Sequence, residues 1–523
     1  MTHHRLDVNR LSRRQVLKMA VTGTLGIAAG PLWPAFDLSA ASQNSAVSGS
    51  REFSPDLDIH LAARPTETSL FAGALTRIWQ FQASVIKGSR DRVTEIPRSY
   101  LGPIIRANRG EKVRIRFSNA IPEKSIIHWH GLHVPAIMDG HPRDVVAPGE
   151  TYLYEFKVKN RAGTYWYHPH PHGRTGPQVY RGLAGLFLVS DQEELALGLP
   201  SGPNDIPLVI QDRTFDRGNQ LVYTSGHMME QTIGFLGDQV LVNGRPDFTL
   251  PVSTKAYRLR LLNGSNSRIY RLAWEDGRPM TIIGTDGGLL EKPHQRRHLY
   301  LAPGERTELW TDFSDDVVGS QTALMSLPFD IANSGRGMMM GRGMTRRGAL
   351  PNGAGFTIFQ IKVVKRAKDD QVLPQQLSVI DPLQYDGVDN LSNPRKFFLT
   401  ANHMQWSING RTFEMENVAA DEIVRLGARE IWEFHNNAGG MMPMMNMPHP
   451  IHLHGKQFRV LERGGLTHDG YVDEGWKDTV LLMPGEWVRI MVDFDEYPGL
   501  FLYHCHNLEH EDMGMMRNYY VRS

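Results

Sequence analysis

Ala147-Pro148-Gly149-Glu150 leads directly into Thr151–Phe156, a run with strand-like alternation. Nearly the same turn recurs twice before another such run, as Ala302-Pro303-Gly304-Glu305 before Arg306–Trp310 and as Met483-Pro484-Gly485-Glu486 before Trp487–Val492. Pro-Gly favours a turn, and period-two alternation is typical of a half-buried strand. Upstream of each turn, a further alternating run ends in Asn, at 113–119, 257–263 and 430–436. Two features repeated in one order at domain-sized spacing predict three tandem copies of one β domain.

The overall composition fits three such domains. The chain has 523 residues, which leaves room for about three domains of roughly 150 residues. It holds 50 Gly and 31 Pro and few long helical patterns, which favours β-sandwiches. We therefore predict an all-β chain with domains at 52–192, 204–366 and 374–523. The net charge of +1 gives no sign of a nucleic-acid partner or of an electrostatic membrane anchor.

The first 41 residues carry the pattern of an export signal. Arg13 and Arg14 lie before a mildly apolar stretch, Met19–Leu38, which is followed by the small residues Ser39-Ala40-Ala41. These are the parts of a secretory signal peptide, and the paired arginines resemble the twin-arginine kind. No other segment has the roughly 20 uninterrupted apolar residues that a membrane span needs. We expect a monomeric mature protein without a membrane span, exported by the twin-arginine route to the periplasm or beyond.

Histidines gather in four short clusters, two in the first predicted domain and two in the third. The clusters are His128-Trp129-His130, His168-Pro169-His170, His449-Pro450-Ile451-His452-Leu453-His454 and His504-Cys505-His506. Because residues two apart on a strand point the same way, a His-x-His pair can present two imidazoles to one site. One such pair could be coincidence or a zinc site, but four pairs argue against both. The middle repeat has no such cluster, which predicts a metal site shared by the outer domains with the middle domain as a spacer.

The only cysteine of the chain lies inside the last cluster. Together with His449, His510 and Met515, Cys505 would supply two imidazoles, a thiolate and a thioether, the ligand set of blue-copper electron-transfer sites. His504 and His506 flank Cys505 and would face the opposite side of its strand. This arrangement predicts one metal on each side of the strand, joined by a few covalent bonds. His133 and His172 have no clear place in the set, and we expect them not to be ligands.

At these residues the chain resembles the multicopper oxidases of the three-domain cupredoxin type, which include bacterial cuprous oxidases, laccases and bilirubin oxidases. The resemblance implies three tandem cupredoxin-like Greek-key β-sandwiches and four copper ions. It implies that one-electron substrate oxidations at a type 1 copper drive the reduction of dioxygen to water at a three-copper cluster. By motif position, the type 1 ligands would be His449, Cys505, His510 and Met515; the type 2 ligands His128 and His452; and the type 3 ligands His130, His168, His170, His454, His504 and His506.

Reduction of dioxygen to water also consumes protons, and two acidic residues match positions where the family places carboxylates beside the cluster. They are Asp139, in Met138-Asp139-Gly140, and Glu511, directly after His510. A proton relay needs an acid within hydrogen-bond reach of the bound oxygen, or one water away. The alternative is a solvated loop aspartate and a structural glutamate.

Two methionine-rich segments bear on the substrate. Met441, Met442, Met444, Met445 and Met447 end two residues before His449, and a second segment, Met338–Met344, lies in a Gly- and Arg-rich loop at 334–348. Thioethers are soft ligands that prefer Cu(I), so the first group predicts a cuprous oxidase. Methionine also makes adaptable apolar surfaces, which leaves open laccase-like oxidation of phenols. Unlike cuprous oxidases of the best-known type, the chain has no carboxylate just before His449.

Three other classes share some of these features. A copper nitrite reductase would have a type 1 site but neither a third domain nor four His-x-His pairs. A copper-free scaffolding relative, such as a cell-division factor of this superfamily, would have lost several ligands. A copper-storage protein would explain the methionines but not a cysteine between two histidines. We therefore predict a multicopper oxidase that acts on Cu(I), with phenol oxidation as the alternative.

Overall fold

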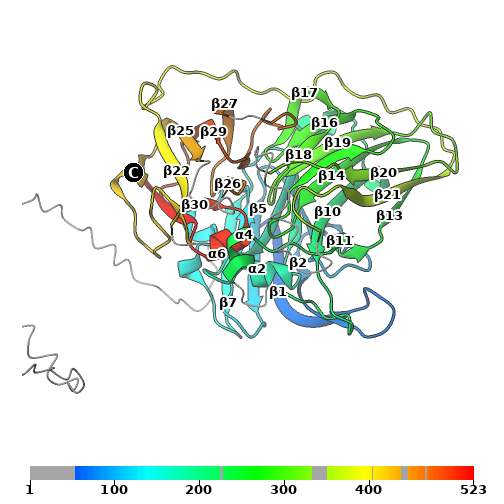
Figure 1. Cartoon of the computed structure of the whole chain (residues 1–523), viewed down its shortest axis with the longest axis horizontal. Coiled ribbons are helices and arrows are strands. Elements are labelled where there is room, and N and C mark those ends of the chain that lie inside the picture. The colour runs from blue at the N-terminus through cyan, green and yellow to red at the C-terminus, as the bar shows by residue number, and fades with distance from the viewer. Residues whose placement is uncertain (1–52, 224–227, 332–349, 403–404, 438–445, 466–467) are drawn as a thin grey trace, which may run out of the picture. The chain divides into compact units, whose positions relative to one another are not determined.

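The computed structural model describes residues 53–223, 228–331, 350–402, 405–437, 446–465 and 468–523 (Figure 1). All of these described residues belong to one compact unit. The described elements are mostly strands, so the prediction of an all-β chain is confirmed. The predicted export signal, 1–41, lies outside the described residues. Within the described part of the chain, no helix is long and apolar enough to cross a membrane.

The strands of the described ranges form six sheets that follow one another in pairs along the chain. The first pair has the orders β2(Thr76–Lys87)-β1(Leu57–Thr68)-β5(Lys112–Asn119)-β7(Thr151–Lys157) and β3(Val93–Thr94)-β4(Ile104–Asn108)-β9(Gly185–Ser190)-β8(Gly163–Pro169)-β6(Ile127–His130). The second has β12(Arg245–Pro246)-β11(Gln239–Val242)-β10(Asp205–Arg213)-β14(Ala256–Asn263)-β19(Arg306–Asp312)-β16(Met280–Thr285)-β17(Gly288–Arg296) and β13(Thr249–Ser253)-β21(Phe356–Lys365)-β20(Gln321–Ser326)-β15(Tyr270–Trp274)-β18(Leu299–Leu301). The third has β23(Gln405–Ile408)-β22(Arg395–Asn402)-β25(Ala428–Asn436)-β29(Glu486–Phe494)-β27(Phe458–Gly465) and β24(Ile423–Arg425)-β31(Met516–Arg522)-β30(Gly499–Cys505)-β26(His449–Leu453)-β28(Thr479–Leu482).

Short helices connect these strands. The α-helices of the described residues are α2(Thr175–Tyr180), α3(Gln192–Ala196), α4(Met228–Ile233) and α6(Leu508–Asp512), and the single 3-10 turns are η1(Arg90–Arg92), η2(Ala136–Met138), η3(Pro142–Asp144), η4(Gly202–Asn204) and η6(Ala420–Glu422). Helix α6 follows β30 and contacts both α2, which follows β8, and α4, which follows β10 (Figure 1). The three sandwiches therefore meet around α6.

The same strand triple recurs in one sheet of each sandwich. In each triple a parallel pairing is followed by an antiparallel one: β1 with β5 and then β7, β10 with β14 and then β19, and β22 with β25 and then β29. The middle strand of each triple is the alternating run that ends in Asn, and the third strand follows the Pro-Gly turn. The internal repeat in the sequence is therefore a repeat of topology.

Hydrogen bonds around the first turn explain why Asn and Glu recur with Pro-Gly. The Asn119 side chain donates to the carbonyl of Val146, and its backbone carbonyl accepts from Gly149 at 2.7 Å. The Glu150 carboxylate accepts from the backbone N–H of Ala147 at 2.8 Å. Asn263 with Glu305, and Asn436 with Glu486, make the equivalent bonds in the other two sandwiches. Each turn is thus closed by one amide and one carboxylate, because its backbone groups need partners.

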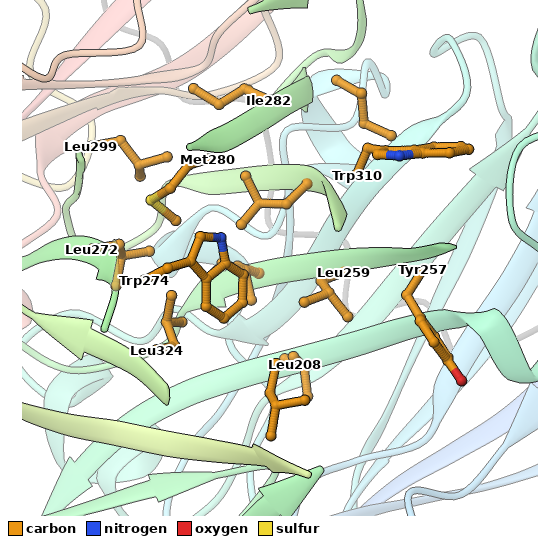
Figure 2. Close-up of a cluster of buried hydrophobic side chains, with 14 of the residues drawn as sticks. Leu208, Tyr257, Leu259, Leu272, Trp274, Met280, Ile282, Leu299, Trp310 and Leu324 are labelled. Atoms are coloured by element: carbon orange, nitrogen blue, oxygen red, sulfur yellow. The ribbon is translucent and has the colours of Figure 1, made fainter. Parts of the chain in front are cut away.

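Each pair of sheets encloses its own apolar core, as expected when alternate residues of every strand point inward. In the second sandwich, Leu272, Trp274 and Leu324 come from one sheet and meet Leu208, Leu259 and Ile282 from the other (Figure 2). Separate clusters fill the first and third sandwiches. The cluster of the third sandwich includes Cys505 and Met515, so the cysteine is part of an apolar core.

Candidate metal centre

Strand pairing brings the four histidine clusters together two by two. His128 on β6 lies opposite His168 on β8, and His452 on β26 lies opposite His504 on β30. The ten histidines proposed as ligands from the sequence are all at most 1% exposed: His128, His130, His168, His170, His449, His452, His454, His504, His506 and His510. Burial lowers the pKa of most of them, to about 3 for His168 and His510. Neutral imidazole is the form that binds metals.

One pair of imidazoles joins the first sandwich to the third. The Nε2 atoms of His128 and His452 lie 3.2 Å apart. Each Nδ1 atom donates to a backbone carbonyl, from His128 to Asp139 at 2.7 Å and from His452 to Asp478 at 2.8 Å. With the proton on Nδ1, each Nε2 presents a lone pair to the other. Two lone pairs that face each other in a buried site are the arrangement that a shared cation stabilises.

A second group lies next to His128, on which the ring of His454 stacks, and joins the same two sandwiches. The Nε2 atom of His504 is 3.0 Å from Nε2 of His454 and 3.4 Å from Nε2 of His170. The Nδ1 atom of His454 donates to the Asp139 carboxylate at 2.8 Å, and Nδ1 of His504 donates to the Cys505 carbonyl at 3.1 Å. The Nε2 atoms of His454 and His504 are therefore unprotonated acceptors, so this group also fits a metal ion.

A third group has buried nitrogens without any partner. His168 donates through Nδ1 to the Pro169 carbonyl at 3.0 Å, whereas its Nε2 finds no hydrogen-bond partner in the described part of the chain. The same is true of Nδ1 of His130 and of both nitrogens of His506. The rings of His130 and His506 lie 4.9 Å apart, centre to centre. Each buried unpaired polar group costs about 1–3 kcal/mol, so these nitrogens fit metal ligands better than core side chains.

The thiol of Cys505 lies on the other side of β30 from these groups. Its Sγ is 3.4 Å from Nδ1 of His449 and 3.6 Å from Nδ1 of His510, and these two nitrogens are 3.3 Å apart. The backbone carbonyl of Met515, a fully buried residue, accepts from the Cys505 N–H at 3.0 Å. Burial raises the pKa of the thiol, so a thiolate here needs a bound cation. The set of two imidazoles and one thiol, with Met515 hydrogen-bonded to Cys505 through its backbone, fits copper.

Two buried carboxyls lie beside the imidazoles of the second group. The Asp139 side chain bonds to His454, and the Asp139 backbone carbonyl bonds to His128. The Glu511 carboxyl approaches Nδ1 of His504 at 3.2 Å and Nε2 of His170 at 3.3 Å, but without hydrogen-bond geometry. Burial raises the pKa of both carboxyls well above the usual range. Both are therefore biased toward the protonated form, which can donate a proton.

The other residues singled out from the sequence lie apart from these groups. His172 packs against Phe413, with ring centres 4.9 Å apart, and the Nδ1 atom of His133 lies 3.9 Å from the Glu496 carboxylate. Neither belongs to a possible metal-binding group among the described residues. Met447 is buried in the core of the third sandwich. Met441, Met442, Met444, Met445 and the loop at 334–348 lie outside the described residues.

Several residues around the imidazoles have no signal in the sequence. Nε2 of His130 lies 3.0 Å from the Asp478 carboxylate, and Asp478 is fully buried. Asp478 and Thr479 are found only through topology, because β28 pairs with β26 and sets Thr479 opposite His452. On the thiol side, the Thr232 carbonyl accepts from Nε2 of His510 and from the indole N–H of Trp406, each at 2.9 Å.

Comparisons with known proteins agree with this chemistry. Two family models, each described as multicopper oxidase, match residues 78–194 and 389–523. The chain is 33% identical to the multicopper oxidase mco of Staphylococcus aureus over 82% of this chain and 84% of that protein. It is 32% identical to a laccase of Bacillus stratosphericus over 80% and 88%. It is also 33% identical to the cell division protein FtsP of Sodalis glossinidius over 85% and 87%.

Solved structures give the same answer for the fold. The multicopper oxidase McoA of Aquifex aeolicus matches with a TM-score of 0.76 and 36% identity, over 90% of this chain and 97% of that one. A multicopper oxidase from Campylobacter jejuni, described as a metallo-oxidase, matches with a TM-score of 0.72 and 26% identity, over 89% and 91%. The predicted cupredoxin-like β-sandwiches are therefore confirmed. The chain belongs to the multicopper oxidase family, copper enzymes that oxidise metal or phenolic substrates, and it is an oxidoreductase that uses dioxygen as electron acceptor.

Proposed function

We propose that this protein oxidises Cu(I), one electron at a time, at a type 1 copper and reduces dioxygen to water at a cluster of three further coppers. The type 1 ligands are His449, Cys505, His510 and Met515. The type 2 ligands are His128 and His452, and the type 3 ligands are His130, His168, His170, His454, His504 and His506. We also propose three domains at 52–192, 204–366 and 374–523, and export of the chain by a twin-arginine signal at 1–41.

The arrangement at the end of β30 is the observation that carries this proposal. The Cys505 thiol lies between His449 and His510 on one side, while the next residue back, His504, lies between His454 and His170 on the other. The Cys505 carbonyl also accepts a hydrogen bond from His504. The two groups are therefore linked through adjacent backbone and through one hydrogen bond, which supports electron transfer from the thiol side to the imidazole side.

Bound copper would supply one-electron redox chemistry and the capacity to reduce dioxygen. The protein's own residues orient most of the imidazoles, since carbonyls and carboxylates fix the protonated nitrogen of those rings. They also exclude bulk water, because all ten ligand histidines are buried. Glu511 and Asp139 would supply protons, since both touch imidazoles of the cluster and burial favours their protonated forms.

The assignment of Cu(I) as substrate rests on the methionines that precede His449. Their thioethers are soft and polarizable, which favours Cu(I) over hard cations. Five of them, Met441, Met442, Met444, Met445 and Met447, lie within nine residues of a type 1 ligand in the sequence. Of these, Met447 packs in the core, so binding of Cu(I) from solvent would depend on the other four. A structural relative described as a metallo-oxidase supports the same class of substrate.

Laccase-like oxidation of phenols is the second candidate. It is favoured by the absence of a carboxylate just before His449, where the chain reads Met445-Asn446-Met447-Pro448. A relative named laccase supports it as well. Phenols would need an apolar surface rather than a ligand set, and methionines can provide that too.

Steady-state rates with Cu(I) and with a simple phenol separate the two candidates. The five methionines are replaced by Leu, which keeps the apolar volume and removes the sulfur. We expect the variant to lose Cu(I) oxidation more than phenol oxidation, and a control variant, Met280→Leu in the middle sandwich, to lose neither. Equal losses on both substrates would instead favour a packing role. Copper analysis of the purified protein tests the chemistry itself, since a copper-free scaffold would bind none.

A further inference from the structure

We propose that the middle sandwich is more than a spacer: its Pro-Gly turn and the following Arg306 position His130 and His506 of the imidazole cluster. This inference rests on the proposed function, because it takes both histidines as copper ligands. It assigns no ligand to the middle sandwich. Gly304 and Arg306 act through the histidines that they touch and are therefore positioning residues.

Gly304 brings the turn of the middle sandwich against two imidazoles. Its φ is +85°, and a Cβ built there would lie 3.0 Å from Cγ of His506 and 3.1 Å from Cε1 of His130. Contacts this short require the neighbours to shift. The backbone of Gly304 is therefore the surface on which both rings rest, one from the first sandwich and one from the third.

The equivalent glycine of the first sandwich makes no such contact. Gly149 has nearly the same φ, +86°, and donates the same hydrogen bond, to the carbonyl of Asn119 rather than Asn263. A Cβ built on Gly149 would meet no atom within 4 Å. The two glycines share a motif and a backbone conformation. They differ in their neighbours, because imidazole rings pack against the Cβ position of Gly304 and no atom lies close to that of Gly149. Of these two glycines, only Gly304 also lies against rings of the imidazole cluster.

Arg306, two residues further on, ties the three sandwiches together at the same place. Its guanidinium donates to both carboxylate oxygens of Asp478 in the third sandwich, at 2.7 and 2.5 Å. It also donates to the Thr164 carbonyl of the first sandwich at 2.9 Å and to the Asp286 carbonyl of the second at 2.9 Å. Arg306 and Asp478 are both fully buried, so each needs the other as its counter-charge.

Asp478, held in place by Arg306, in turn accepts hydrogen bonds from two histidines of the cluster. Its carboxylate accepts from Nε2 of His130 at 3.0 Å, which leaves Nδ1 of His130 free for a metal ion. Its backbone carbonyl accepts from Nδ1 of His452. Asp478 lies close enough to His130 and His452 to be a metal ligand itself. Because one guanidinium nitrogen occupies each of its oxygens, we assign it the orienting role instead.

Alanine at each of the two matched glycines tests the first part of the proposal. Both substitutions impose the same backbone strain, since both sites have φ near +85°. In the copper-loaded full-length enzyme, we expect Gly304→Ala to lower dioxygen reduction by about 10- to 100-fold. Its copper content should fall or the spectra of its type 3 coppers should change, while the blue type 1 colour persists. Gly149→Ala should leave copper content, spectra and turnover as in the wild type.

A substitution of Arg306 tests the second part of the proposal. It also provides a test that does not depend on whether Gly304→Ala folds. Arg306→Lys keeps the charge but cannot bond both oxygens of Asp478 in the same way. We expect it to retain the blue colour and to change the type 2 signal and the copper content. Unchanged copper content and spectra in Arg306→Lys, or identical behaviour of the two alanine variants, would overturn the positioning role. A wild-type protein that binds no copper would instead overturn the proposed function.

Discussion

The thiol site and the imidazole cluster lie on opposite sides of β30, but they are built in different ways. The side chains around Cys505 come from one sandwich, on β26, β30 and α6, with one carbonyl, that of Thr232, from the second. The imidazole cluster combines histidines of the first and third sandwiches, and the second contributes Gly304 and Arg306. The thiol site therefore depends mainly on the fold of one domain. The cluster forms only when the first and third domains are docked, and the second supports it through Gly304 and Arg306.

Replacement of Cys505 should break the thiol site and leave the cluster in place. In Cys505→Ser, we expect complete loss of the blue colour and of substrate-driven turnover, because the hydroxyl is a poor substitute for the thiolate in copper binding. The cluster should keep its copper, since none of its imidazoles contacts the sulfur. Copper analysis, visible absorption and steady-state rates on the purified variant check this. Turnover at the wild-type rate would show that electrons do not pass through Cys505.

Replacement of Glu511 should have the reverse effect, on the cluster side alone. Gln has the same shape and cannot release a proton, so Glu511→Gln should lower dioxygen consumption by about 10²- to 10⁴-fold. The blue colour should remain, because the Glu511 carboxyl lies against His504 and His170 and makes no hydrogen bond to the thiol. A single-turnover experiment should show the type 1 copper reduced by substrate at the normal rate and reoxidised slowly. Normal reoxidation would assign Glu511 a structural role.

The sequence predicted those parts of this comparison that depend on local patterns. Three turns and three alternating runs predicted the repeated β domain, because turn chemistry and period-two alternation act over a few residues. The histidine pairs predicted a shared site, since the middle repeat lacks them. The contact between His130 and Asp478 spans 348 residues and follows only from the docking of two sandwiches. The role of Gly304 could not be predicted either, because the Pro-Gly-Glu sequence is the same in all three turns.

The last prediction concerns the docking of the first sandwich to the third at His141. This imidazole is fully buried, donates through Nε2 to the Asn518 side chain at 2.9 Å, and accepts through Nδ1 from the Arg143 N–H at 3.2 Å. The ring is therefore held neutral, and burial lowers the pKa of His141 to about 3. An unfolded chain takes up this proton near pH 6.5, so the unfolded state binds more protons below that pH. Stability from this group is thus lost as the pH falls from 6.5 toward 3.

The variant His141→Gln should reduce that loss, since Gln can donate and accept but does not titrate. We expect the free energy of unfolding of the copper-free enzyme to fall with pH less steeply than in the wild type, by about 1.4 kcal/mol per pH unit at most, between pH 6 and pH 4. Urea unfolding of both proteins at several pH values measures the difference. The protonation of the ligand histidines is common to both proteins and cancels, and the value at pH 7 isolates any packing effect of Gln. Parallel pH profiles would mean that His141 accepts a proton in the folded state with a pKa close to that in the unfolded chain. The hydrogen bond to Asn518 would then not keep the ring neutral.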